Sequence, residues 1–212
     1  MLLSRRQLLG QFAGAVAVAP GLAQPPRRPS EATPNEIVGP FYPLTKPADS
    51  DADLTRVAGR PGRALGPAIE VSGRIMDLAG RPVPHARLEI WQANAAGRYT
   101  HPSDDNTAPL DPNFQGYASL RADASGEYRI VTVKPGAYPG GRRGMRTPHI
   151  HFDLSGRVDR LVAQMYFPDE PLNATDALLS ANIRPAMVIA SAAGVTASGV
   201  PRFRWDVILR SG

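Results

Sequence analysis

The chain has 212 residues, a formal net charge of +5 at neutral pH, no cysteine, 22 prolines and 20 glycines. The absence of cysteine excludes disulfides, thiolate metal sites, iron–sulfur clusters and a cysteine nucleophile. The mild basic excess comes without a Lys/Arg run interleaved with aromatic residues, so no nucleic acid is expected as a partner. The length predicts one domain with a sizeable core.

The first 23 residues predict an export signal. Arg5 and Arg6 open a basic region, an apolar run covers residues 12–19, and residues 21–23 supply small side chains before a cleavage point. The apolar run is too short to span a membrane. The adjacent arginines favour a twin-arginine signal, with an ordinary Sec signal as the alternative. We therefore expect an exported protein, periplasmic or extracellular, whose formal charge falls to +3 on cleavage.

The rest of the chain divides at about residue 66. Residues 24–66 are Pro-rich without sustained periodicity, which predicts a tether and an irregular arm, whereas residues 67–212 form the main domain. Short alternating runs between turn signals predict strands near residues 69–75, 86–90, 128–132, 149–154, 161–167 and 203–209. A short helix is expected near residues 174–180, and the long irregular stretch 94–115 is typical of a functional loop. We predict an all-β fold, a β-sandwich of mainly antiparallel strands with long functional loops.

Two histidines one residue apart, His149 and His151, suggest a metal site. On a strand they point to one face, while Ile150 points into the core. Tyr99 and Tyr138 lie in Gly- and Pro-rich segments, where loops commonly present ligands. Two imidazoles and two phenols suit Fe(III), because a phenol with a pKa of about 10 needs a strong Lewis acid to bind as phenolate. A hydrogen-bonded histidine pair with packed tyrosines is the structural alternative.

Four motifs stand in the order of a known family: residues 91–99 (WQANAAGRY), 110–114 (LDPNF), 134–139 (KPGAYP) and 146–152 (RTPHIHF). Together with residues 39–43 (GPFYP), 164–167 and 203–210, they make the chain resemble the intradiol ring-cleavage dioxygenases, especially the protocatechuate 3,4-dioxygenase type. The resemblance covers about residues 38–210. It implies Fe(III) held by Tyr99, Tyr138, His149 and His151 in a catalytic β-sandwich domain. It also implies that both atoms of O₂ enter a catechol-type substrate, whose ring opens between the hydroxyl-bearing carbons to a cis,cis-muconate.

The same resemblance assigns the catalytic residues. Tyr138 would leave the metal when the substrate binds, Arg146 would lie beside the substrate ring, and Gln164 would line the same pocket. The chain lacks the long helical N-terminal region of the catechol and hydroxyquinol enzymes, which favours the protocatechuate branch. That branch generally builds its pocket from two different subunits, which a single exported chain need not do. Whether a second subunit completes the pocket stays open, with a homo-oligomer as one arrangement. The preferred catechol stays open, and the loop residues Asp104 and Asp105 are expected to be solvated.

Two other functions fit the same residues less well. One is an exported β-sandwich binding module without catalysis, which would make the four ligand types coincidental. The other is the same site filled by zinc or copper, although tyrosine is an unusual ligand for zinc.

Overall fold

The computed structural model describes residues 31–212, so the expected export signal lies outside the described residues. Within this range the strands are β1 Ala68–Asp77, β2 Arg87–Trp91, β3 Tyr117–Arg121, β4 Glu127–Val133, β5 Tyr138–Pro139, β6 Met145–Arg146, β7 His149–Ser155, β8 Arg160–Tyr166, β9 Ser191–Val195, β10 Pro201–Arg204 and β11 Val207–Leu209. The helical segments are η1 Gly141–Arg143, η2 Pro171–Ala174, α1 Ala177–Ala181 and η3 Pro185–Met187. No helix in the described part of the chain is long and apolar enough to cross a membrane.

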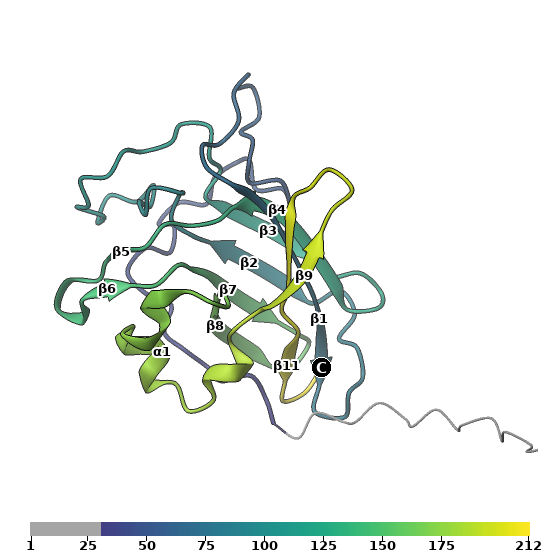
Figure 1. Ribbon diagram of the computed structural model, residues 1–212. Helices are drawn as coiled ribbons and strands as arrows, with labels where there is room; N and C mark the ends of the chain where they lie inside the picture. The colour runs from purple at the N-terminus through teal and green to yellow at the C-terminus, as the bar shows by residue number, and fades with distance from the viewer. Residues whose placement is uncertain (1–30) are drawn as a thin grey trace, which may run out of the picture.

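Two β-sheets form the body of the molecule (Figure 1). In one sheet, β1 pairs with β10 and β11 in parallel and with β4 in antiparallel, and β9 pairs with β10. The second has the order β3-β2-β7-β8, and all its pairs are antiparallel. Only the pairs of β1 with β10 and β11 are parallel among those described for the two sheets. The predicted all-β sandwich of mainly antiparallel strands is confirmed.

Strand alternation separates the core from the outer face of the second sheet. Ile90, Ile150 and Phe152 point inward, are fully buried, and join the apolar cluster that the first sheet completes. Full burial of side chains of this size stabilises the fold by about 1.5–3 kcal/mol each. Their neighbours Trp91 and His151 are cross-strand partners and point to the opposite face. The histidine pair therefore lies outside the sandwich core.

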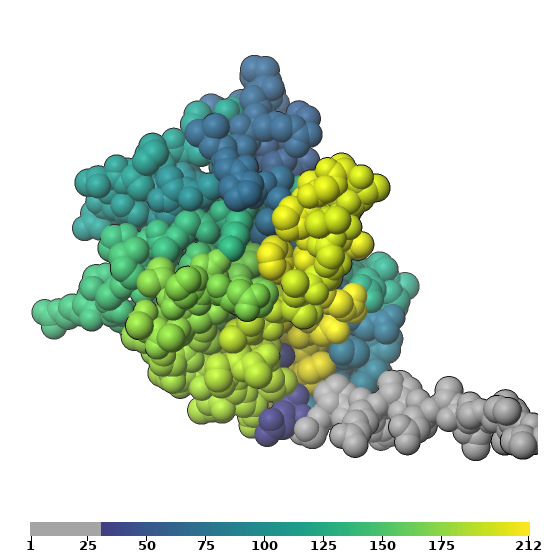
Figure 2. Space-filling view, viewed as in Figure 1, coloured from purple at the N-terminus to yellow at the C-terminus, as the bar shows by residue number. Residues whose placement is uncertain are grey.

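Irregular segments cover this outer face. The arm from residue 31 is fixed by backbone hydrogen bonds to both sheets, including Glu36 N to Val162 O (2.7 Å) and Leu54 N to Val131 O (2.8 Å). The long loop after β2, the β5–β6 hairpin and α1 complete the cover. The hairpin projects from the body of the molecule, as both the ribbon and the space-filling view show (Figures 1 and 2).

The strand predicted over residues 203–209 is interrupted. β10 and β11 pair with β1 in one continuous register, since Glu70 faces Arg202 and Ile75 faces Val207. Between them the Asp206 carboxylate, rather than a backbone carbonyl, accepts the N–H of Arg74 (2.9 Å). The unchanged register explains why the alternation continues through the break.

Candidate metal and substrate site

The four predicted ligand residues converge on the outer face of the second sheet. His149 and His151 come from β7, Tyr138 opens β5, and Tyr99 lies in the loop after β2. The two histidine Nε2 atoms are 3.2 Å apart, and the Tyr138 hydroxyl is 3.2 Å from His149 Nε2. The Tyr99 ring lies 5.3 Å from that of Tyr138 and 6.2 Å from that of His151. All four side chains are only 1–6% exposed.

The histidines are in the form that binds metals. The Nδ1–H of His149 donates to the Thr147 carbonyl (2.6 Å), which leaves the Nε2 lone pair for a ligand bond. Burial, with a contribution from Arg146, lowers the pKa of His149 to about 3. Burial and the neighbouring His149 lower the pKa of His151 well below its usual value. Both rings are thus neutral at physiological pH.

The tyrosines fit a highly charged cation. Among the described residues, the buried hydroxyl of Tyr99 has no hydrogen-bond partner. Burial, and then the adjacent Tyr138, raise the pKa of Tyr99 well above its ordinary value, so only a strong local positive charge would hold it as phenolate. Within residues 31–212 no cluster of three or more His, Cys, Asp or Glu side chains occurs, so a four-residue donor set at this site needs the tyrosines. The donor set present fits Fe(III).

Two glycines allow the tyrosine-bearing loops to cross at backbone contact. Gly97 has φ +80°, and a Cβ placed on it would lie 2.2 Å from the carbonyl oxygen of Ala137. A Cβ on Gly136 would lie 2.6 Å from Ala95 O and from Gly97 N. Each tyrosine follows two residues after one of these glycines, so the crossing sets the distance between the two phenol rings.

The arm covers the two tyrosines of the site. The Phe41 ring packs 4.6 Å from the Tyr99 ring and 6.0 Å from the Tyr138 ring. The next residues are anchored on the sheet, because the Tyr42 hydroxyl and the Lys46 ammonium both donate to the buried Glu89 carboxylate on β2. The arm thereby shields the phenols from water with an aromatic side chain of the same chain.

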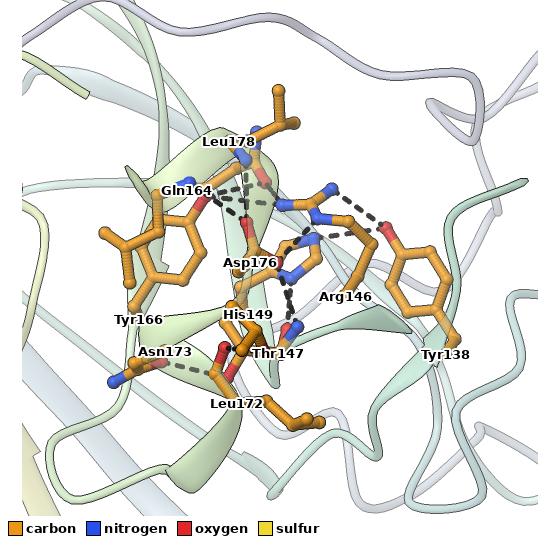
Figure 3. A network of polar contacts seen from close by, with 12 residues as sticks. Tyr138, Arg146, Thr147, His149, Gln164, Tyr166, Leu172, Asn173, Asp176 and Leu178 are labelled. Carbon is orange, nitrogen blue, oxygen red and sulfur yellow. Dashed lines mark hydrogen bonds and ion pairs between the residues drawn. The ribbon is translucent and has the colours of Figure 1, made fainter. Parts of the chain in front are cut away.

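Arg146 and Gln164, the other two predicted site residues, lie beside Tyr138 and His149 (Figure 3). Arg146 Nη2 donates to Gln164 Oε1 (2.6 Å) and to the Tyr166 hydroxyl (3.3 Å), and its Nη1 is 3.5 Å from the Tyr138 hydroxyl. Burial raises the pKa of Tyr138, while the Arg146 cation opposes that rise. The amide nitrogen of Gln164 is buried and has no partner within the described chain.

Sequence reasoning missed several supporting residues. Asp104 is buried, and its carboxylate accepts the backbone N–H of Tyr99 (2.7 Å), so the expectation that it is solvated was wrong. It also accepts the N–H of Asn106, two residues later. This short-range turn pattern is a signal the sequence could have provided. Tyr166 and Asp176 were also missed, although an Asp directly before a short helix is a typical N-cap.

Cavities flank the site. One of about 340 Å³ is lined by Phe41, Trp91 and Tyr99, and another of about 370 Å³ is lined by Glu36, Gln164 and other residues. A larger cavity, of about 600 Å³, contains none of the predicted site residues and lies at the first residues of the arm. The chemistry of the lining residues, rather than size, therefore points to the two cavities beside the tyrosines and Gln164.

Comparisons with known proteins agree with this geometry. Residues 37–211 match a family model described as Dioxygenase. The chain is 42% identical to a protocatechuate 3,4-dioxygenase beta chain of Burkholderia cepacia, over 81% of this chain and 76% of the relative. It is 30% identical to a catechol 1,2-dioxygenase of Acinetobacter baylyi over 68% of this chain, and spans about half (49%) of that relative. The dioxygenase domain of a carbohydrate-binding fusion from Streptomyces sp. SirexAA-E superposes with a TM-score of 0.65 at 26% identity, covering 86% of this chain and 100% of that domain.

Proposed function

The chain belongs to the intradiol dioxygenase family, and from this premise we propose that it opens a catechol-type ring with O₂ at a ferric site, to a cis,cis-muconate. The observation that carries the proposal is the convergence of two neutral imidazoles and two buried phenols, one of which has no hydrogen-bond partner among residues 31–212. Tyr99, Tyr138, His149 and His151 would hold the iron. When bound, Fe(III) would take both substrate oxygens and make the electron-rich ring reactive toward O₂.

The residues around the ligands have separate tasks. As a phenolate, the Tyr138 oxygen would accept a proton from a substrate hydroxyl. Arg146 would stabilise negative charge that develops on the substrate, because its cation is fixed and buried beside Tyr138. Gln164 would use its unpartnered amide N–H to orient the ring or its substituent. Phe41 would keep water away from the phenols.

The similarity to a protocatechuate 3,4-dioxygenase beta chain favours protocatechuate or a related carboxylated catechol as the substrate. Catechol and other substituted catechols are the competing candidates, in line with the catechol 1,2-dioxygenase relative. We further propose export to the periplasm or beyond by the twin-arginine route, on the basis of Arg5 and Arg6. Fractionation of cells that express the full chain, with Arg5→Lys/Arg6→Lys as the control, tests the export route.

A visible spectrum of the purified protein tests the ferric site. We expect a phenolate-to-iron absorption band that shifts on anaerobic addition of protocatechuate or catechol, and ring opening when O₂ is admitted. Tyr99→Phe should weaken iron binding and change the band. Tyr117→Phe is a matched control, because it removes another buried hydroxyl that has no partner in the described part of the chain and lies outside the proposed ligand set.

The rival functions give different results. A protein that holds zinc or copper in place of iron by elemental analysis would favour another metal chemistry. A protein that stays colourless and metal-free after iron reconstitution would favour a binding module and overturn the proposal.

A further inference from the structure

The buried carboxylate of Asp176 connects Arg146 to His149, one of the candidate iron ligands. Asp176, between η2 and α1, has no exposed surface and accepts four hydrogen bonds. Its Oδ1 accepts the N–H groups of Leu178 and Leu179, both at 2.9 Å, and so caps α1. Its Oδ2 accepts Arg146 Nε (2.8 Å) and the backbone N–H of Thr147 (2.9 Å). Figure 3 shows these contacts together.

The contact with Arg146 fixes the guanidinium group. With Nε held by Asp176, the two terminal nitrogens point to Gln164 and to the Tyr138 hydroxyl. Both partners of this ion pair are buried, with side-chain exposures of 6% and 0%. Removing one partner of a buried pair leaves an uncompensated charge and is strongly unfavourable. The orientation of Arg146 thus depends on the Asp176 carboxylate.

The contact with Thr147 extends to a histidine. The Thr147 N–H is held by Asp176, and its hydroxyl lies 2.9 Å from Asn173 Oδ1. The Thr147 carbonyl accepts the Nδ1–H of His149 (2.6 Å), the bond that turns His149 Nε2 toward the other ligand residues. Groups that orient a ligating histidine in this way commonly change metal affinity or activity about 10–100-fold when removed.

We propose that Asp176 is a positioning residue that fixes Arg146 beside the substrate and, through the backbone of Thr147, His149 at the metal. This inference rests on the proposed ferric function. It does not make Asp176 a catalytic residue, because its four hydrogen bonds all go to other protein groups.

Asp176→Asn is the discriminating variant. An amide of the same shape can still accept the two α1 N–H groups through its oxygen, but its NH₂ then faces two donors, Arg146 Nε and the Thr147 N–H. We expect iron affinity, measured by chelator competition, to fall about 10–100-fold and kcat for ring opening to fall at least about tenfold. Ala177→Gly is the control, because it weakens the exposed first turn of α1 without altering those two contacts.

A double-mutant cycle with Arg146→Gln separates the effect of Asp176 on Arg146 from its effect on His149. The double variant also removes both buried charges, which keeps the test usable if Asp176→Asn alone folds poorly. The kcat losses of the two changes should be less than additive, while the iron affinity of the double variant should lie below that of Arg146→Gln alone. Strict additivity with unchanged iron affinity would overturn the proposal, as would an Asp176→Asn protein that behaves like Ala177→Gly. A wild-type protein that binds iron but opens no ring would refute the proposed function, and the affinity comparison would still decide the role of Asp176.

Discussion

The crossing of the two tyrosine-bearing loops predicts a large effect for the smallest possible substitution, Gly97→Ala. The new Cβ would lie 2.2 Å from Ala137 O, so the two backbones must separate by about 1 Å. A left-handed backbone at an alanine costs about 1–2 kcal/mol, and overpacking adds about 1–3 kcal/mol. We therefore expect the free energy of unfolding to fall by about 2–5 kcal/mol, a substantial share of the stability of a typical domain.

Comparison with Gly194→Ala separates the steric cost from the cost of a left-handed backbone at alanine. Gly194 has the same φ of +80°, but a Cβ there would meet no atom within 4 Å. Its substitution should cost only the backbone term of about 1–2 kcal/mol and leave iron binding unchanged. Gly136→Ala supplies the complementary case, since its Cβ would clash at 2.6 Å without a positive φ.

Urea unfolding of the iron-free proteins measures the stability differences, and the visible band of the iron-loaded proteins measures the tyrosine spacing. Gly97→Ala and Gly136→Ala should both shift or weaken the band. If Gly97→Ala and Gly194→Ala were equally stable and had identical iron spectra, the loop crossing would not determine the distance between the phenols.

Two further predictions concern the inner strand β1 and the arm. The hydrogen bond from Arg129 holds the pKa of the buried Glu70 below its usual value of 4.5, with help from Arg202 and against the opposing effect of burial. The contribution of Glu70 to stability is therefore present above about pH 4.5 and is lost as the pH falls through the lower folded-state pKa. Glu70→Gln should cost about 1–2 kcal/mol at pH 7, and a cost in urea unfolding that stays the same down to pH 2 would contradict this account. Phe41→Ala removes ring contacts with Tyr99 and Tyr138 worth about 0.5–1.5 kcal/mol each. We expect it to shift the iron band and raise KM while the iron content stays the same. An unchanged spectrum would mean that the arm does not shield the two phenols.

The strands that pack on the core could be predicted from the sequence, because alternation reports directly on burial. Ile69, Val71 and Ile75 are buried as their spacing predicts, and Ile150 points into the core between two outward histidines. The strands that alternation did not predict are β3, β9 and the two-residue strands β5 and β6. β9 is exposed at every residue and made of small side chains, so it carries no hydrophobic period.

The four candidate ligands could be named from their residue types and motifs, whereas their supports could not. Asp104 and Asp176 act through hydrogen bonds to backbone groups brought close by the fold; the sequence carries a local turn pattern at one and an N-cap pattern at the other, but neither pattern shows that the carboxylate is buried or that it supports the site. The arm is similar, because its anchor joins Tyr42 and Lys46 to a carboxylate more than forty residues away. A contact at that separation leaves no local periodicity to detect.

The position of the site on the outer face has a consequence for how the protein loses activity. The two histidines of β7 stand on a sheet whose other face belongs to the main apolar cluster, but Tyr99 is presented by a loop, Tyr138 by the short strand β5, and Phe41 by the arm. Segments held by few buried apolar contacts open at lower free energy than the strands beneath them. Heating or mild denaturant should therefore bleach the iron band before the sheets unfold, so that colour and circular dichroism would report two separate transitions.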